Sequence, residues 1–506
     1  MTAVDPRSPC LIGAARHTWH AADAPDGAPE PLDMWEHVAR AAALDAGAPD
    51  APAQLERIDV VYTQSWQYDD PPARLAERLG ASPTPAAARL HYTGIGGSVP
   101  HALVAAEAMK ILDGHLDLAL IVGAEALATV RRLKKAGEKP AWSFPPAERR
   151  PFPMEMDFHR SEIAHAVFQA YLTFALFDNA RRAHLGRTPT EHAAQLGRLL
   201  APLTEIAAAS PHAWFPRART AAEISTPSAD NRMVAYPYTK LMTAIMDVDM
   251  AAGLLLASAA KADSLGVPEE KRVYLRGWGY DEDHSHVADH AELWRSPAMG
   301  VASNLALGAA GLWIDEVAHL DLYSCFASSV NFALDALGLD EDDPRPVTQT
   351  GGLPYHGGPG SNYMTHSIAA MAETLRADPG SYGLVSGVGM HMQKHVYGVW
   401  STTPGTIALE RTTGTSAGTP TGKPAPSRIV ASPEGRATVA TYSVLHGRDG
   451  GPESALLICD LPGDGRCYAT LDGGADAMAE AEAVELIGRT VTLTPQHDGV
   501  NLARLD

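Results

Sequence analysis

The chain has 506 residues, of which 45% are hydrophobic and 20% charged, a composition typical of a globular protein with two to four domains. Its formal net charge of −20 argues against a surface for nucleic acid or anionic membranes, unless basic residues are segregated in one patch. The four cysteines have neither metal-site nor disulfide-framework spacing, and the N-terminus has no apolar signal segment, which together favour a reducing cytoplasm. No apolar run is long enough to predict a membrane-spanning helix.

Short apolar strands alternate with helices in the first part of the chain. Strands are predicted at Cys10–Trp19 and Ile58–Trp66, with a helix between them. This alternation indicates βαβ units and a mainly parallel sheet.

A glycine-rich turn, a capped helix and an apolar strand occur in this order twice. The first copy is Gly94–Leu127, with Ser98 as the predicted N-cap and Pro100 in the first helical turn. The second copy is Gly351–Met390, with Ser361 as the predicted cap. A helix N-terminus behind such a turn offers free N–H groups to a phosphate, a carbonyl or an oxyanion, although a purely structural turn is an equally good interpretation. The repeat predicts two related α/β halves whose turns face one site.

Residues 131–232 interrupt this alternation with prolines, a long predicted helix and basic clusters. The clusters are Arg131–Lys135, Arg149–Arg150 and Arg181–Arg182. An insertion of this kind is usually a lid or a ligand-binding subdomain, although solvated helix faces explain the charges at least as well.

The character of the sequence changes after about Pro404. A Thr/Gly/Pro-rich linker at residues 412–427 precedes short strands separated by glycine and acidic turns. This pattern predicts a small all-β domain similar to an OB barrel. Eight Lys or Arg against thirteen Asp or Glu from Thr406 to Asp506, with few aromatic residues on the strands, argue against nucleic acid as its ligand.

Several blocks, in their order along the chain, resemble the thiolase superfamily and in particular its sterol-carrier-protein-linked branch. These blocks are GIGGSVPHAL with LDLALIVGAEAL, DVDMAAGLLLASAAKADSLG, DLYSCFASSVN, GGLPYHGGPGSN and VSGVGMHM. With its additional β domain, the whole chain resembles the group called thiolase-like protein type 1. The resemblance implies an α/β protein with a duplicated, five-layered αβαβα thiolase fold, an inserted loop domain and a C-terminal OB-like domain. The implied domains are residues 1–130 with 233–275 for the first half, 131–232 for the loop domain, 276–405 for the second half and 406–506 for the β domain.

Thiolases transfer acyl groups through a nucleophilic cysteine, an activating histidine and a second cysteine that moves a proton. The resemblance places these roles at Gly96, Gly358 and Gly387, and it places Tyr323 where relatives carry asparagine or histidine. Because glycine cannot act as a nucleophile, ordinary thiolase chemistry is not expected. A pocket lined by the glycine turns and two helix N-termini is expected to remain and to hold a thioester carbonyl.

Three residues are candidates for substitute catalysis: His356, Cys325 and His391. A His–Cys pair within hydrogen-bonding distance would supply a nucleophile and a base. Cys325 is also well explained as a small buried hydrophobic residue. His391 and His395 have i, i+4 spacing, but the predicted strand or hairpin does not place them on one helix face, so no metal site is predicted.

Binding of coenzyme A requires cations or N–H groups for its phosphates. By the resemblance these lie in the loop domain and the segment after it, where Arg232 and Lys240 are the first candidates, although surface ion pairing explains both equally well. Gly96, Gly358 and Ser98 are the predicted contacts of the thioester end of the ligand. Ser98 is also explained as a helix cap.

These residues and the resemblance predict an acyl-CoA-binding protein of the acetyl-CoA acetyltransferase superfamily, involved in lipid metabolism and lacking ordinary thiolase activity. If the protein is active, it is an acyltransferase on thioesters. Acyl-CoA or an acyl-carrier thioester is the expected ligand, and no further cofactor is required. The alternative is a non-catalytic scaffold or regulatory subunit for a partner acyltransferase or hydratase, docking through the C-terminal β domain.

Overall fold

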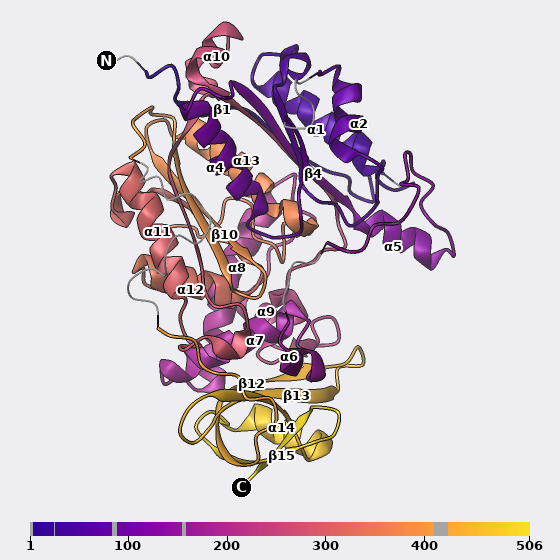
Figure 1. Ribbon diagram of the computed structural model, residues 1–506, viewed down its shortest axis with the longest axis vertical. Coiled ribbons are helices and arrows are strands. Elements are labelled where there is room, and N and C mark those ends of the chain that lie inside the picture. Colours follow the sequence, from indigo (N-terminus) through magenta and orange to yellow (C-terminus); the bar gives the residue numbers. More distant parts are fainter. Residues whose placement is uncertain (1–3, 25, 83–88, 154–157, 409–423) are drawn as a thin grey trace.

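The computed structural model describes residues 4–24, 26–82, 89–153, 158–408 and 424–506. The α/β core and the C-terminal barrel lie at opposite ends of the molecule, with the helices of the insertion between them (Figure 1). Most of the predicted linker lies outside the described residues. No helix in the described part of the chain is long and apolar enough to cross a membrane.

A nine-stranded mixed sheet forms the α/β core, with the strand order β3-β2-β4-β7-β1-β8-β11-β10-β9. Among the described strands, parallel pairing joins β3 to β2, β2 to β4 and β10 to β9, whereas the other neighbours are antiparallel. The expectation of a mainly parallel sheet is therefore wrong. The reason is that β11 follows β10 through a tight hairpin turn, and β7 is reached through the long insertion instead of a single crossover helix. The strands are β1 (Pro9–Thr18), β2 (Arg57–Val60), β3 (Leu90–Tyr92), β4 (Leu118–Ala126), β7 (Asp249–Ser258), β8 (Val273–Glu282), β9 (His319–Asp321), β10 (Tyr382–Gly389) and β11 (Lys394–Ser401).

The strand topology repeats within the sheet. Each half has one parallel pair of strands followed by two antiparallel pairs. The strand order is β2-β4-β7-β1 in the first half and β9-β10-β11-β8 in the second. The halves meet where Cys10 of β1 lies opposite Tyr274 of β8. The duplication predicted from the sequence is confirmed, and the predicted boundary between residues 275 and 276 falls within β8.

Helices α4 (Val99–Leu112) and α13 (Tyr363–Ala377) follow the two glycine turns and pack against each other. In Figure 1 they lie between the two halves of the sheet, with α1 (Pro31–Asp45) and α2 (Pro71–Leu79) outside one half. Helices α11 (Pro297–Ala310) and α12 (Ala327–Leu337) lie outside the other half, which completes the five layers.

The caps of the two central helices differ from the prediction in part. Pro100 lies in the first turn of α4, and Ser98 holds the N-cap position without a capping bond from its side chain. The N-cap of α13 is Asn362. Ser361 lies one residue earlier, and its hydroxyl instead accepts a hydrogen bond from the first glycine turn.

The insertion contributes helices and a hairpin that reach the C-terminal barrel. The hairpin consists of β5 and β6, and Ala235 of β5 pairs with Leu445 of β12. The helices of this region are α5 (Leu127–Lys135), α6 (Arg160–Ala164), α7 (Ala170–His184), α8 (Pro189–Ala209) and α9 (Ala221–Ser225), and the hairpin strands β5 (Met233–Ala235) and β6 (Tyr238–Thr239) follow directly after residue 232. Helix α10 (Ala259–Ser264) follows β7 and packs on the core.

The C-terminal strands close into a barrel because β12 pairs with both β13 and β15. The ring is completed by β13 with β14, β14 with β16 and β16 with β15, and one helix, α14 (Gly474–Ala483), lies between β14 and β15 in the chain. This arrangement is consistent with the predicted OB-like domain, although the last strand was not predicted. The strands are β12 (Gly435–His446), β13 (Pro452–Asp460), β14 (Arg466–Leu471), β15 (Thr490–Pro495) and β16 (Asn501–Leu505).

Candidate functional site

The two glycine turns meet between the halves of the core. The backbone N–H of Gly96, in the turn before α4, donates a hydrogen bond of 3.0 Å to the hydroxyl of Ser361, in the turn before α13. The two turns therefore face one another, as the repeat in the sequence predicted.

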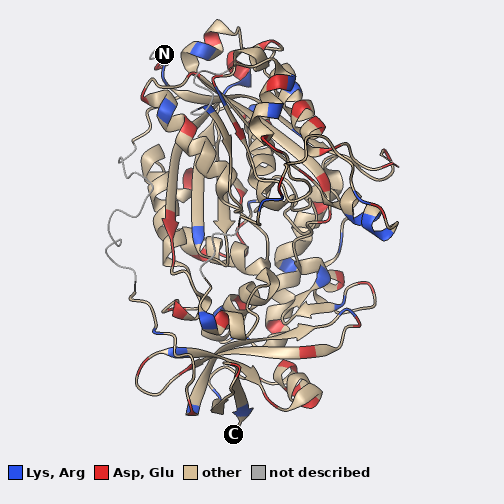
Figure 2. Cartoon of the chain, turned by 45° about the vertical axis from the view of Figure 1, so that its right-hand side comes forward, with Lys and Arg blue, Asp and Glu red and all other residues tan. Residues whose placement is uncertain are grey.

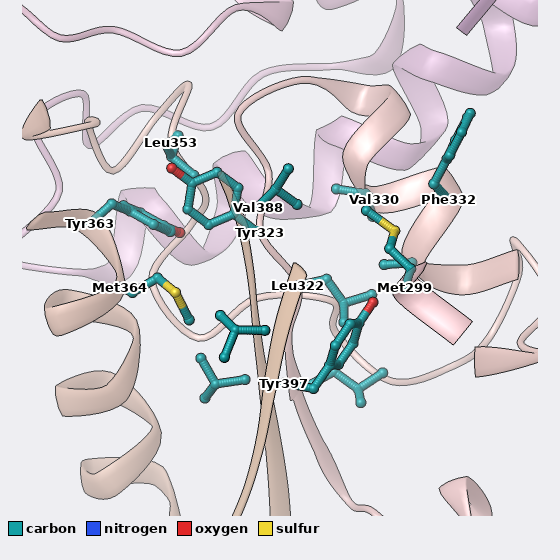
Figure 3. Packing of buried hydrophobic residues seen from close by; sticks show 14 of the residues in the cluster. Met299, Leu322, Tyr323, Val330, Phe332, Leu353, Tyr363, Met364, Val388 and Tyr397 are labelled. Atoms are coloured by element: carbon teal, nitrogen blue, oxygen red, sulfur yellow. The ribbon is translucent and has the colours of Figure 1, made fainter. Parts of the chain in front are cut away.

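Side chains fill the space beside these glycines. A Cβ placed on Gly387 would clash with the sulfur of Met364, and a Cβ on Gly97 would clash with the hydroxyl of Tyr323. Leu353 is less close to Gly358, 3.3 Å from the position of a Cβ there, which is a tight contact. Figure 3 shows Tyr323, Leu353 and Met364 packed together with Tyr363 and Val388. The pocket expected between the turns is therefore occupied by the protein's own apolar side chains.

The N–H groups expected to hold an oxyanion are bonded within the protein. Gly96 donates to Ser361, and Gly358 donates to the carbonyl of Ile245 at 2.8 Å. Gly360 donates to the carbonyl of Gly358, also at 2.8 Å. The backbone donors of Gly96 and Gly358, two of the predicted contacts of the thioester end, are thus paired within the protein. Ser98 is buried beside β10, where its hydroxyl lies 2.8 Å from the position of a Cβ on Gly389.

His356 and Cys325 have separate hydrogen-bond partners. Nε2 of His356 lies 3.3 Å from Nδ1 of His366, and Sγ of Cys325 lies 3.0 Å from Oγ of Ser329. Burial, with a further contribution from the Arg16 guanidinium, holds the pKa of His356 well below its usual range. Burial also raises the pKa of the Cys325 thiol to about 12. At neutral pH the His356 imidazole is therefore neutral and the Cys325 thiol is protonated. The two side chains do not form a thiolate–imidazolium pair.

His391 lies in the hairpin turn between β10 and β11, where its ring contacts Phe158. Burial lowers the pKa of His391 to about 4. His395 lies on β11 and contacts Asp283 and Ser296 instead, at 3.2 and 3.1 Å. The hairpin therefore separates the two histidines, and no group of three His, Cys, Asp or Glu side chains among the described residues is arranged to hold a metal ion.

A cavity of about 460 Å³ opens at the end of the first glycine-turn unit, where α5 follows β4. It is lined by Ala128, Arg131, Arg132, Lys135, Phe215, Lys240, Ile245 and Asp247. Figure 2 shows the run of Lys and Arg along α5. Four cations thus surround one cavity on a protein whose net charge is −20.

Two lining residues of the cavity are bonded to the second glycine turn. Its lining residue Ile245 accepts the hydrogen bond of Gly358, and its lining residue Phe215 donates from its backbone to the carbonyl of Tyr355 at 3.0 Å. Asp247 pairs with Arg131, which leaves three cations without that counter-charge. The cavity therefore presents cations suited to an anionic group beside the second turn.

The sequence singled out one residue of the cavity as a ligand contact, Lys240. The guanidinium of Arg232 instead donates to the carbonyl of Met233 at 2.8 Å and is not among the lining residues. The α5 cations were visible as the RRLKK cluster, but they were equally well explained as a solvated helix face. No pattern in the sequence indicated that Phe215 and Lys240 lie beside the cations of α5.

A buried acid beside the second turn was also missed. Glu125, at the end of β4, accepts hydrogen bonds from the backbone N–H groups of Gln64 (2.8 Å) and Ser65 (3.1 Å). A Cβ on Gly360 would clash with this carboxyl group. Glu125 therefore holds the loop after β2 and lies against the second turn.

The fold is that of the thiolase superfamily, as comparison with solved structures shows. The Ltp2-ChsH2(DUF35) aldolase is 16% identical, with a TM-score of 0.57, and covers 78% of this chain and 98% of that one. The acetyl-CoA acetyltransferase from Syntrophomonas wolfei is 15% identical, with a TM-score of 0.54 and coverages of 79% and 100%. The dimeric peroxisomal thiolase of Saccharomyces cerevisiae is 15% identical, with a TM-score of 0.53 and coverages of 79% and 98%. At these identities the likeness concerns the fold alone.

A further structure identifies the family. The monomeric SCP2-thiolase-like protein type 1 from Mycobacterium smegmatis is 31% identical, with a TM-score of 0.84, and the match covers 100% of both chains. The chain belongs to the SCP2-thiolase-like protein type 1 family, which confirms the resemblance found in the sequence. No model of a protein family and no curated protein matches the sequence.

Proposed function

We propose that the protein binds coenzyme A or its thioesters in the cavity beside α5 and has no ordinary thiolase activity. The observation that carries this proposal is the set of four cations and one aromatic ring, Phe215, around a single cavity. Phosphates of the ligand would pair with Arg131, Arg132, Lys135 and Lys240, since charge-assisted hydrogen bonds are the strongest that such groups form. Phe215 offers a face on which an adenine ring can stack.

The packing between the turns limits how far the ligand enters. Its pantetheine end would run along Ile245 toward Gly358, but Tyr323 and Met364 fill the space beyond. The thioester would therefore stop at the edge of the second turn. The binding affinity would then come from the coenzyme A portion of the ligand and depend little on the acyl group.

The contacts of His356 favour binding over catalysis. Its ring is buried, neutral and directed at His366, so a role as general base would need a rearrangement of that pair. Catalysis centred on His356, with Cys325 or His391, is the second form of the hypothesis. A His356→Ala variant that loses turnover of a thioester, while still binding coenzyme A, would support it.

The scaffold alternative places a partner protein on the C-terminal barrel. One edge of that barrel is already covered by the chain's own hairpin, at the pairing of Ala235 with Leu445. A partner would therefore use the remaining surface. The solved aldolase with a named DUF35 component makes a protein partner a reasonable alternative for this chain as well.

Calorimetric titration of coenzyme A and acetyl-CoA tests the leading proposal. We expect binding in the micromolar to sub-millimolar range, weakened about tenfold by Lys240→Ala, since a hydrogen bond to a charged group contributes about 1.5–3 kcal/mol. Lys261→Ala removes a cation on α10 and is the matched control. Absence of binding below 1 mM would refute the proposal, and significant thiolysis by the wild-type protein would refute the absence of thiolase activity.

A further inference from the structure

We propose that the surface around the mouth of this cavity docks an acidic carrier protein, which inserts its phosphopantetheine arm where coenzyme A would bind. The inference deepens the proposed function and rests on it. Coenzyme A and a carrier protein present the same phosphopantetheine group, so one cavity can take either. What distinguishes the carrier is the protein body that must then lie outside the cavity.

The charges at the mouth fit an acidic body. Helix α5 has the sequence LATVRRLKK, with four cations and no acidic residue. Arg131 and Arg132 line the cavity, where they contact Asp247 and the carbonyl of Asp26. Lys134 is exposed on the same helix and is outside the set of lining residues, so it can contact only a ligand that extends beyond the cavity.

The negative charge of the rest of the protein makes this basic helix distinctive as a site for an acidic partner. With a net charge of −20, the protein as a whole repels an acidic partner. A local run of cations then sets where and in which orientation such a partner approaches, because complementary charges act mainly on encounter and register. Three cations of this basic helix line the cavity, so the approach that charge favours brings the arm of the carrier to the cavity.

Apolar side chains beside the cations provide a second, independent reason to expect a protein. Phe215 is 42% exposed, and Met246 is 45% exposed between the lining residues Ile245 and Asp247. Aromatic residues, Met and Arg are the types enriched in protein–protein interfaces. A free nucleotide accounts for the cations and for stacking on Phe215, whereas an exposed methionine at the rim is better explained by a protein partner.

The experiment measures binding of a bacterial acyl carrier protein with and without its phosphopantetheine arm, alongside coenzyme A, by surface plasmon resonance. Lys134→Glu tests the docking surface, and Lys240→Ala tests the cavity. Lys261→Glu changes the total charge by the same amount as Lys134→Glu but lies on α10, at the far end of the core (Figure 1). Thermal unfolding of each variant verifies that it is folded.

We expect the carrier with its arm to bind about tenfold more tightly than the carrier without it. Lys134→Glu should weaken this binding about fivefold and leave the affinity for coenzyme A unchanged, because charge reversal outside the cavity acts on the body of the carrier alone. Lys240→Ala should weaken both ligands, and Lys261→Glu neither.

Other outcomes separate this inference from the proposed function. If coenzyme A binds and the carrier with its arm does not, the docking surface is refuted and the proposed function stands. Equal binding of the two carrier forms, or equal effects of Lys134→Glu and Lys261→Glu, would likewise overturn the docking. If neither coenzyme A nor the carrier binds, both proposals fall.

Discussion

The sulfur of Met364 lies where the side chain of residue 387 would project if that residue were not Gly387. Met364 is fully buried in the first turns of α13, and Gly387 is on β10. The absence of a Cβ on the strand therefore lets the central helix pack closely against it. By the resemblance to thiolases, position 387 belongs to a catalytic cysteine, so the same contact fills the place of the proton-moving thiol.

This contact predicts that a cysteine cannot simply be restored. Gly387→Cys should lower the free energy of unfolding by about 1–3 kcal/mol, the usual cost of adding atoms to a packed core. In a Met364→Ala background the added penalty of Gly387→Cys should largely disappear, because the methionine no longer occupies the space. Denaturant unfolding of the four proteins gives the coupling between the two positions.

The matched control for this cycle is Gly300→Ala on α11, where a Cβ would meet nothing within 4 Å. This variant should be neutral or more stable by about 0.5–1 kcal/mol, since alanine favours a helix. If Gly387→Cys costs the same with and without Met364, the packing argument is wrong.

Tyr323 leads to a prediction about ligand selectivity. Its hydroxyl closes the space beside Gly97, so the wild-type protein should bind coenzyme A, acetyl-CoA and propionyl-CoA with similar affinity. Tyr323→Ala should open that space and favour the longer acyl group by up to about fourfold per methylene, given about 0.8 kcal/mol for each buried CH₂. Calorimetric affinities, taken as ratios to coenzyme A, remove effects common to all three ligands.

Tyr323→Phe keeps the ring and removes only the hydroxyl oxygen, so it should change these ratios much less than Tyr323→Ala. A wild-type protein that already prefers propionyl-CoA strongly over coenzyme A would contradict the closed space seen between the turns.

Local patterns in the sequence were sufficient to predict the repeated units of the core. A turn, a helix of the correct period and an apolar strand are encoded within each unit, and both α4 with β4 and α13 with β10 are found where the pattern placed them. Direction of strand pairing is a tertiary property, and the mainly parallel sheet was for that reason predicted wrongly. The last barrel strand, Asn501–Leu505, is too short to give a clear pattern alone.

The candidate site was less predictable because it depends on contacts between distant segments. The contact of Met364 with Gly387 follows from how α13 packs against β10 within the second half, which the sequence pattern of neither element specifies. Similarly, α5 was visibly basic, whereas its approach to Phe215 and Lys240 is set by the fold. Arg232 was a reasonable candidate from its neighbourhood in the sequence, but its β-hairpin turns toward the barrel.

Asn179 joins the insertion to the barrel and provides a third prediction. Its amide donates to the carbonyls of Tyr236 (3.1 Å) and Tyr442 (2.8 Å), and the side chain is fully buried. Asn179→Ala leaves both carbonyls without this donor and should cost about 2–4 kcal/mol of unfolding free energy. Asn304→Ala, at an exposed position of α11, should cost less than about 0.5 kcal/mol. Equal stability of the two variants would show that this bond does not hold the barrel to the insertion.

Glu125 predicts a pH dependence of stability. Burial raises the pKa of this carboxyl to about 7 from 4.5, although hydrogen bonds from Ser65 and Gln64 oppose the shift. Between these values the folded protein holds a proton that the unfolded chain releases. The contribution of Glu125 to the free energy of unfolding is therefore fully present below about pH 4.5 and is lost as the pH rises through 7, by up to about 3 kcal/mol.

Glu125→Gln removes this titration and isolates it from those of other buried groups. The difference in unfolding free energy between wild type and Glu125→Gln should change with pH between about 4.5 and 7 and be constant above about pH 8, with the wild type losing stability relative to the variant as the pH rises. Glu138→Gln changes an exposed glutamate shortly after α5 and should follow the wild-type profile. A difference that is flat across this range, or that has the opposite slope, would mean that the hydrogen bonds from the loop after β2 outweigh burial and keep Glu125 ionised in the folded protein.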